Sequence, residues 1–111
     1  MDEFSDKKCV ACEAGVEPLR AEQVIQHLNK LGGGWEPADD FTKIGKRFDF
    51  RNFAQSFDFV KKVAAIAEAE NHHPDILFGW GYCAIVLQTH AIGGVHENDF
   101  IVASKINKIL G

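Results

Sequence analysis

The sequence feature that most constrains the fold is a helical repeat of apolar residues that ends at a proline. The apolar positions recur every three or four residues and neighbouring positions widen the stripe, giving the set Phe53, Phe57, Val60, Val63, Ala64, Ile66 and Ala67. Pro74 limits the helix, because the residue before a proline avoids helical dihedral angles. The sequence therefore predicts an amphipathic helix whose apolar stripe belongs to the core and whose exit turn carries His72 and His73.

Two further helices are predicted, one before and one after this repeat. The earlier helix begins near Leu19 and keeps apolar residues at helical spacing until the glycines at 32–34 stop it. These glycines lack the strand-before, helix-after context of a phosphate loop. The later helix begins at residues 96–99, where Asp99 fits the third position of a capping box, although His96 stands where Ser or Thr would cap better.

Strand patterns fill the two gaps between the helices. Residues 34–50 indicate two short strands around a turn at 37–40, and residues 75–90 indicate two more. Alternation leaves His90 at the end of the last strand on its more open side, and it gives the opposite, core-facing set Cys83, Ile85, Leu87 and Thr89. The order α-β-β-α-β-β-α predicts an α+β domain with the helices on one side of an antiparallel sheet.

The start of the chain shows no sustained period, so we expect an N-terminal arm at 1–17, loosely attached to a single domain at 18–111. The net charge of −4 and the lack of a basic run argue against nucleic-acid binding. No apolar run approaches the length of a membrane span, and the N-terminus has no signal-peptide pattern. The three cysteines are an odd number, so a reducing cytoplasm is the simplest compartment.

Residues suited to acid–base chemistry gather around the predicted helix exit. Histidine exchanges protons near neutral pH because its ordinary pKa is roughly 6.5. Glu68 lies one helical turn before His72, where we expect it to hydrogen-bond to that ring. His90 stands at the end of a strand that a hairpin could return to the same edge. Three imidazoles and a carboxylate thus outline an acid–base site.

A metal site is the alternative reading of the same side chains. Zinc could in principle bind the three histidines and Glu68, but adjacent histidines diverge from one centre and no H-x3-H spacing exists, so we expect no metal. Cys9 and Cys12 form half of a zinc-ribbon pattern without a second pair. We expect a free reduced pair, with a structural metal or a redox role as the alternative.

The spacing from Glu68 to Asp99, E-x3-H-H-P-x5-W-x9-H-x8-D, resembles the signature of the pterin-4a-carbinolamine dehydratases. The longer segments "RFDFRNFAQSFDFVKKVAAIAEAENHHP" and "THAIGGVHENDFIVASKI" are similar to the same family, so the resemblance spans about residues 18 to 110. The form "HHPDILFGWGYC" and the arm "CVACEAG" resemble the bacterial branch that works beside phenylalanine hydroxylase.

The resemblance implies a four-stranded antiparallel sheet with three helices and association into homodimers or homotetramers. Nine phenylalanines exceed what one small core requires, which also favours a contact between subunits. The implied reaction is loss of water from 4a-hydroxytetrahydrobiopterin to give quinonoid dihydrobiopterin, which recycles the pterin cofactor of aromatic amino-acid hydroxylation. The resemblance also implies that the reaction requires no cofactor, neither a metal nor an organic group.

The resemblance also implies the site residues. By matched position, His72, His73 and His90 are catalytic: we expect His72 and His90 to exchange the two protons and His73 to orient the hydroxyl. Which histidine is the acid stays open. Glu68 is expected to orient His72, and Asp99 to support the helix start near the site.

Trp35 and Trp80 are expected to bind the substrate by flanking the pterin, with a core role as the alternative for each. One departure from some family members is Asn71, which stands where they carry Asp.

Two other functions remain open at this point. In animals the family also supplies a dimerisation partner for a transcription factor, and some relatives act on other pterins, including those linked to molybdenum cofactor. The complete set of three histidines favours the carbinolamine dehydratase, because a pure adaptor would not need them.

Overall fold

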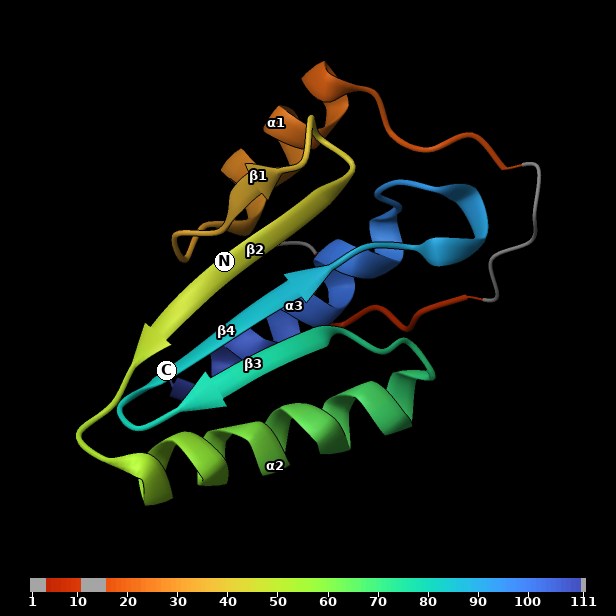
Figure 1. The fold of residues 1–111 in the computed structure, drawn as a ribbon. Coiled ribbons are helices and arrows are strands. Elements are labelled where there is room, and N and C mark those ends of the chain that lie inside the picture. Colours follow the sequence, from red (N-terminus) through yellow and green to blue (C-terminus); the bar gives the residue numbers. More distant parts are fainter. Residues whose placement is uncertain (1–3, 11–15, 111) are drawn as a thin grey trace.

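The computed structural model describes residues 4–10 and 16–110, and all statements below concern these residues. The predicted order of elements is confirmed (Figure 1). The helices and strands are α1 (Ala21–Leu31), β1 (Glu36–Ala38), β2 (Lys43–Asp49), α2 (Phe53–Glu70), β3 (Asp75–Gly79), β4 (Tyr82–Leu87) and α3 (Glu97–Leu110), with a short 3-10 turn at His90–Ile92. No helix in the described ranges is long and apolar enough to cross a membrane.

The four strands form one antiparallel sheet in the order β1-β2-β4-β3, in which the two predicted hairpins are joined by the pairing of β2 with β4. Cys83 of β4 pairs with Phe48 of β2 and with Phe78 of β3, so these three side chains share a face. This face is the predicted core face, and the set Cys83, Ile85, Leu87 and Thr89 is buried. The three helices cover this face and leave the other open (Figure 1).

The predicted second helix exists, but only part of its predicted apolar stripe faces the core. Phe53 and Phe57 are 48% and 47% exposed, and they lie against the ring of Phe78 on the edge strand. The buried side is the set Ser56, Phe59, Val63 and Ala67, so Val63 and Ala67 of the predicted stripe are buried and Phe53 and Phe57 are not. Both sets recur every three or four residues, so periodicity alone could not separate them. Packing separates them, because Phe59 meets the core rings of Phe48 and Phe50.

The expectation of a loosely attached arm is wrong for residues 4–10. Phe4 is fully buried, and its ring lies 5.7 Å from that of Phe100 and 5.6 Å from that of His27. The His27 ring also lies 5.0 Å from that of Phe100, so it has two aromatic neighbours, whereas its place in the sequence suggests a solvated side chain. The division of the chain at residue 17 stays a prediction, and Cys12 lies outside the described residues.

Candidate active site

The exit of α2 is shaped by one left-handed residue. Asn71 has φ 51° and ψ 42°, a conformation that asparagine tolerates better than most residues. The backbone N–H of His72 then donates to the carbonyl oxygen of Ala67 at 3.1 Å, which closes the helix. Pro74 cannot continue the helical bonding pattern. His72 and His73 therefore lie on the exit turn, as the sequence predicts, and their rings contact different carboxylates.

The His72 imidazole meets the carboxylate of Asp99. The distance between His72 Nε2 and Asp99 Oδ1 is 2.6 Å, and Asp99 is fully buried. Its second oxygen, Oδ2, accepts the Thr89 hydroxyl at 2.9 Å and the backbone N–H of His96 at 3.0 Å. A buried carboxylate needs such partners, because an unpaired one would be costly to remove from water. Asp99 thus ties the exit of α2 to the end of β4 and the start of α3.

The start of α3 confirms the predicted capping box and shows how histidine replaces a hydroxyl cap. His96 Nδ1 accepts the backbone N–H of Asn98 at 3.1 Å, while Asp99 reaches back to the N–H of His96. This pair of bonds satisfies two donors that a helix start leaves unpaired. Asp99 therefore supports the helix start, as expected, and also contacts a candidate catalytic ring, which was not expected.

The expected partner of Glu68 requires a correction. Its Oε2 hydrogen-bonds to Nε2 of His73, so its partner among the described residues is His73 and not His72. The i, i+4 rule holds only while the helix continues, and α2 ends at Glu70, so His72 swings away towards Asp99. The side chains of Glu68 and His73 are 77% and 54% exposed. Glu68 can therefore orient His73, but only through a contact that water screens.

His90 reaches the same region from the other direction. β4 ends at Leu87, three residues earlier than the strand pattern suggests, and His90 opens the short turn that follows. The chain folds back because Gly93 adopts a left-handed conformation and Thr89 forms a bridge with Gly94. The His90 ring is exposed and has no hydrogen-bond partner among the described residues.

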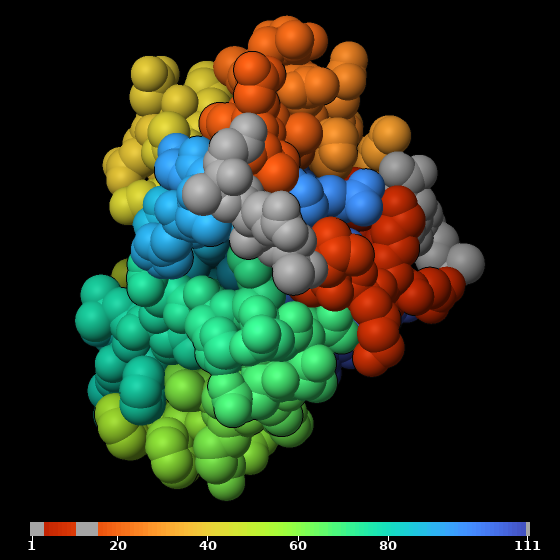
Figure 2. All heavy atoms as spheres, turned by 90° about the vertical axis from the view of Figure 1, so that its right-hand side faces the viewer, coloured from red at the N-terminus to blue at the C-terminus, as the bar shows by residue number. Residues whose placement is uncertain are grey.

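The three histidines line one hollow, which we call the histidine cavity. Its volume is about 360 Å³, and its lining consists of Val10, Asn71, His72, His73, Gln88, Thr89, His90, Ala91 and Asn98. Figure 2 shows the face of the molecule on which the α2 exit, the turn after β4 and the N-terminal segment come together. The predicted convergence of the imidazoles on one rim is therefore present in the fold.

The structure brings neither tryptophan to this cavity. Trp35 is 6% exposed, packs against Phe48 and donates its indole N–H to Asn107 Oδ1 at 2.8 Å, so the core alternative describes it. Trp80 is 72% exposed in the β3–β4 turn, at the opposite end of the strands from the α2 exit (Figure 1). The fold of one chain therefore does not support the expectation that these two residues flank the substrate.

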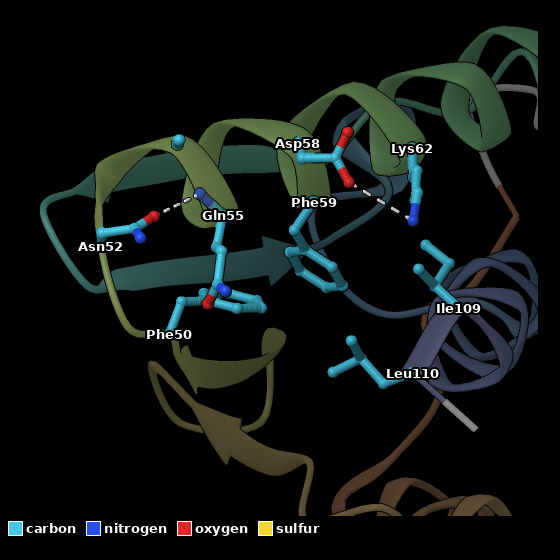
Figure 3. Close-up of a pocket in the computed structure, with 9 residues that line it drawn as sticks. Phe50, Asn52, Gln55, Asp58, Phe59, Lys62, Ile109 and Leu110 are labelled. Atoms are coloured by element: carbon cyan, nitrogen blue, oxygen red, sulfur yellow. Dashed lines mark hydrogen bonds and ion pairs between the residues drawn. The ribbon is translucent and has the colours of Figure 1, made fainter.

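A second hollow of about 430 Å³ lies between α2 and the end of α3 (Figure 3). Phe50, Phe59, Ile109 and Leu110 give it an apolar floor. Its two charged side chains, Asp58 and Lys62, lie 3.4 Å apart and are more than half exposed. Neither histidine nor cysteine lines it, and the two titratable side chains at its edge pair with each other at the exposed surface of α2.

Three residues of the site were missed by reasoning from the sequence. Thr89 had a usable signal, because a hydroxyl placed on a core face must find an acceptor, and Asp99 is that acceptor. No signal in the sequence indicated Asn98 or Val10, because the hydrogen bonds between them join residues that are 88 positions apart.

The chain is similar to known proteins in both sequence and structure. The family model "Pterin 4 alpha carbinolamine dehydratase" matches residues 17–109. A Methylococcus capsulatus protein with the provisional name pterin-4-alpha-carbinolamine dehydratase is 47% identical over 103 residues, covering 93% of this chain and 90% of its own length.

Two solved structures are also similar. A transcriptional coactivator/pterin dehydratase from Brucella melitensis matches with a TM-score of 0.79 and 32% identity, over 86% of this chain and 100% of its own. A pterin dehydratase-like protein described as a RuBisCO assembly factor in the alpha-carboxysome matches with a TM-score of 0.61 and 27% identity, over 73% of this chain and 94% of its own.

Proposed function

The chain belongs to the pterin 4 alpha carbinolamine dehydratase family, and we propose that it dehydrates 4a-hydroxytetrahydrobiopterin to quinonoid dihydrobiopterin by histidine acid–base catalysis. The observation that carries the proposal is the single hollow lined by His72, His73 and His90. Its volume of about 360 Å³ lies within the range that small-molecule sites occupy.

The reaction needs two proton transfers. The 4a-hydroxyl gains a proton and leaves as water, so the bond between C4a and oxygen breaks. N5 loses its proton, and the electron pair left behind forms the double bond between C4a and N5. Imidazoles can give and take protons near neutral pH, and each such transfer typically contributes about 10²–10⁴-fold to the rate.

The contact with Asp99 supports a division of roles between the histidines. When Nε2 of His72 donates to the carboxylate, the neutral ring keeps its lone pair on Nδ1. His72 is then a proton acceptor of fixed orientation, and we assign it the N5 proton. His90 is the proton donor to the leaving hydroxyl, and His73 orients that hydroxyl while Glu68 positions His73.

The wider setting of the reaction is also part of the proposal. We place the protein in the cytoplasm, with recycling of the pterin cofactor of aromatic amino-acid hydroxylation as its role and phenylalanine hydroxylase as a functional partner. The histidine set needs no metal or organic cofactor for this dehydration. The resemblance of the N-terminal arm to the bacterial branch supports this setting.

Self-association is the quaternary part of the proposal. Phe53 and Phe57 on α2 and Leu77 on the edge strand β3 are 48%, 47% and 65% exposed. Large apolar side chains on neighbouring elements typically mark a contact surface. These residues support a homodimer or homotetramer.

A binding role without catalysis is the second candidate. The names of the two similar structures, a coactivator and an assembly factor, favour it, and so do the exposed phenylalanines of α2. The third candidate is dehydration of another pterin, such as one linked to molybdenum cofactor. Three histidines in one hollow favour the carbinolamine dehydratase, because an adaptor gains nothing from them.

The deciding experiment is an assay with enzymatically generated 4a-hydroxytetrahydrobiopterin. We expect the wild type to accelerate formation of quinonoid dihydrobiopterin, and a chelator-treated sample to keep the same rate. Loss of rate with the chelator would support the metal alternative. A wild type that neither binds nor dehydrates the compound would leave the binding role as the better account.

A further inference from the structure

We propose that residues 4–10 form one wall of the histidine cavity and that Val10 is the part of this wall that contacts the bound substrate. The inference rests on the proposed function, because the ligand in question is the flat pterin ring. Residues 4–10 precede the segment that the family model matches, which begins at residue 17. The family model therefore does not account for this wall.

The wall begins at a buried anchor. Phe4 is fully buried against His27 of α1 and Phe100 of α3, with ring centroids 5.6 Å and 5.7 Å away. Lys7 adds an ion pair with Glu97 at 3.3 Å at the start of α3. A phenylalanine in such a position fixes the backbone that follows it, because releasing the segment would expose the whole ring to water.

A second contact attaches residues 4–10 to the end of α2. The backbone N–H of Cys9 donates to Glu70 Oε1 at 2.8 Å, and Glu70 Oε2 pairs with Lys105 Nζ at 3.4 Å. The Glu70 side chain is only 5% exposed. Glu70 is the last residue of α2, two positions before His72, so this bond brings the segment to the edge of the cavity.

A third contact, a pair of hydrogen bonds with Asn98, fixes the position of Val10 itself. Its backbone N–H donates to Asn98 Oδ1 at 3.1 Å, and its carbonyl oxygen accepts from Asn98 Nδ2 at 2.6 Å. One buried amide thus satisfies both polar backbone groups of Val10. Asn98 is itself held by the bond between its backbone N–H and His96, so the wall is joined to the same helix start that holds Asp99.

Val10 is the one large apolar side chain among the residues that line this mostly polar cavity. The residue is 63% exposed, yet it lines the same hollow as His72, His73 and His90. Figure 2 shows the N-terminal segment on the face that carries the α2 exit and the turn after β4. Flat heterocycles bind between apolar surfaces, while a few polar groups fix their orientation. Val10 is placed to supply apolar contact while the imidazoles supply proton transfer.

The test is Val10→Ala, with Val16→Ala as the matched control. Val16 belongs to the same arm and is 44% exposed, but it does not line the cavity. We measure kcat and KM for the carbinolamine, and the Kd of oxidised biopterin by fluorescence quenching. For Val10→Ala we expect KM and Kd to rise roughly three- to tenfold with kcat unchanged, because the contact is made equally in ground and transition states. Val16→Ala should match the wild type.

A double-mutant cycle tests whether the anchor acts through Val10. Phe4→Leu should raise KM in the wild-type background and leave it unchanged in the Val10→Ala background. If the wild type dehydrates the carbinolamine but Val10→Ala keeps the KM and Kd of Val16→Ala, the proposed contact of Val10 with the substrate is refuted and the proposed function stands. A fall in kcat at constant KM would also refute it. A wild type that neither binds nor dehydrates pterins would refute the proposed function, and this inference with it.

Discussion

His72 Nε2 and Asp99 Oδ1 lie 2.6 Å apart, although 27 positions separate the two residues in the sequence. The contact joins an imidazole that is 12% exposed to a carboxylate that is fully buried. The same carboxylate holds Thr89 and the start of α3, so the orientation of a proposed catalytic ring and the local stability of the fold depend on one side chain. Substitutions at Asp99 should separate these two effects.

Asp99→Asn should lower kcat about 10- to 100-fold, as loss of a carboxylate that orients a histidine typically does. The asparagine oxygen can still accept from the N–H of His96, so the melting temperature should fall only slightly. Asp99→Ala should also destabilise the fold, by about 3 kcal/mol, because it leaves the buried hydroxyl of Thr89 and the helix start without an acceptor. Steady-state kinetics and chemical denaturation measure the two quantities. Wild-type kcat in Asp99→Asn would contradict the role assigned to this contact.

His90→Ala should lower kcat about 10²–10⁴-fold, because the leaving hydroxyl loses its proton donor. Its melting temperature should stay that of the wild type, since the ring is exposed. Added imidazole should restore part of the rate through the open cavity. Trp80→Ala serves as the control, because Trp80 is exposed outside the cavity, and it should keep full activity. A near-wild-type rate for His90→Ala would refute its assignment.

Glu68→Ala should change kcat less than Asp99→Asn does, because water screens its contact with His73. Any effect should disappear in a His73→Ala background and persist in a His72→Ala background. Rates of the single and double variants give this comparison. Coupling of Glu68 to His72 in place of His73 would mean that the original i, i+4 expectation was right.

Acid should weaken the attachment of the arm through Glu70. Burial acts to raise the pKa of its carboxyl, but the Cys9 N–H and the charge of Lys105 outweigh burial and leave the pKa below its ordinary value of 4.5. A lowered pKa in the folded state gives stability that is complete above 4.5 and is lost as the pH falls through the folded value. Between about pH 6 and about pH 3, the free energy of unfolding should therefore fall more in the wild type than in Glu70→Gln. Equal losses would contradict the prediction.

Phe57→Asp should break the proposed association of subunits, because it places a charge among the exposed aromatic side chains of α2. Light scattering should then give the mass of one chain, 12.3 kDa, where the wild type gives a multiple of it. Gln55→Asp adds the same charge on another side of α2 and should leave the mass unchanged. A wild type that is already monomeric would refute the proposal.

The sequence by itself determined the features that depend on neighbouring residues. Pro74 and Asn71 end α2, alternation buries Cys83 and Ile85, and the spacing of His96 and Asp99 makes the capping box. These features need only local dihedral preferences and bonds between residues close in the chain. The placement of His72 and His73 on the exit turn follows from the same local rules.

Only the tertiary structure decided which side chains meet. Two sides of α2 share one periodicity, and the packing of Phe59 onto Phe48 selected the buried one. The pairing of His72 with Asp99, and of Val10 with Asn98, joins residues 27 and 88 positions apart. Such contacts depend on how helices and strands stack, and no local preference encodes that stacking, because the energy that fixes it comes from burying surfaces shared between distant elements.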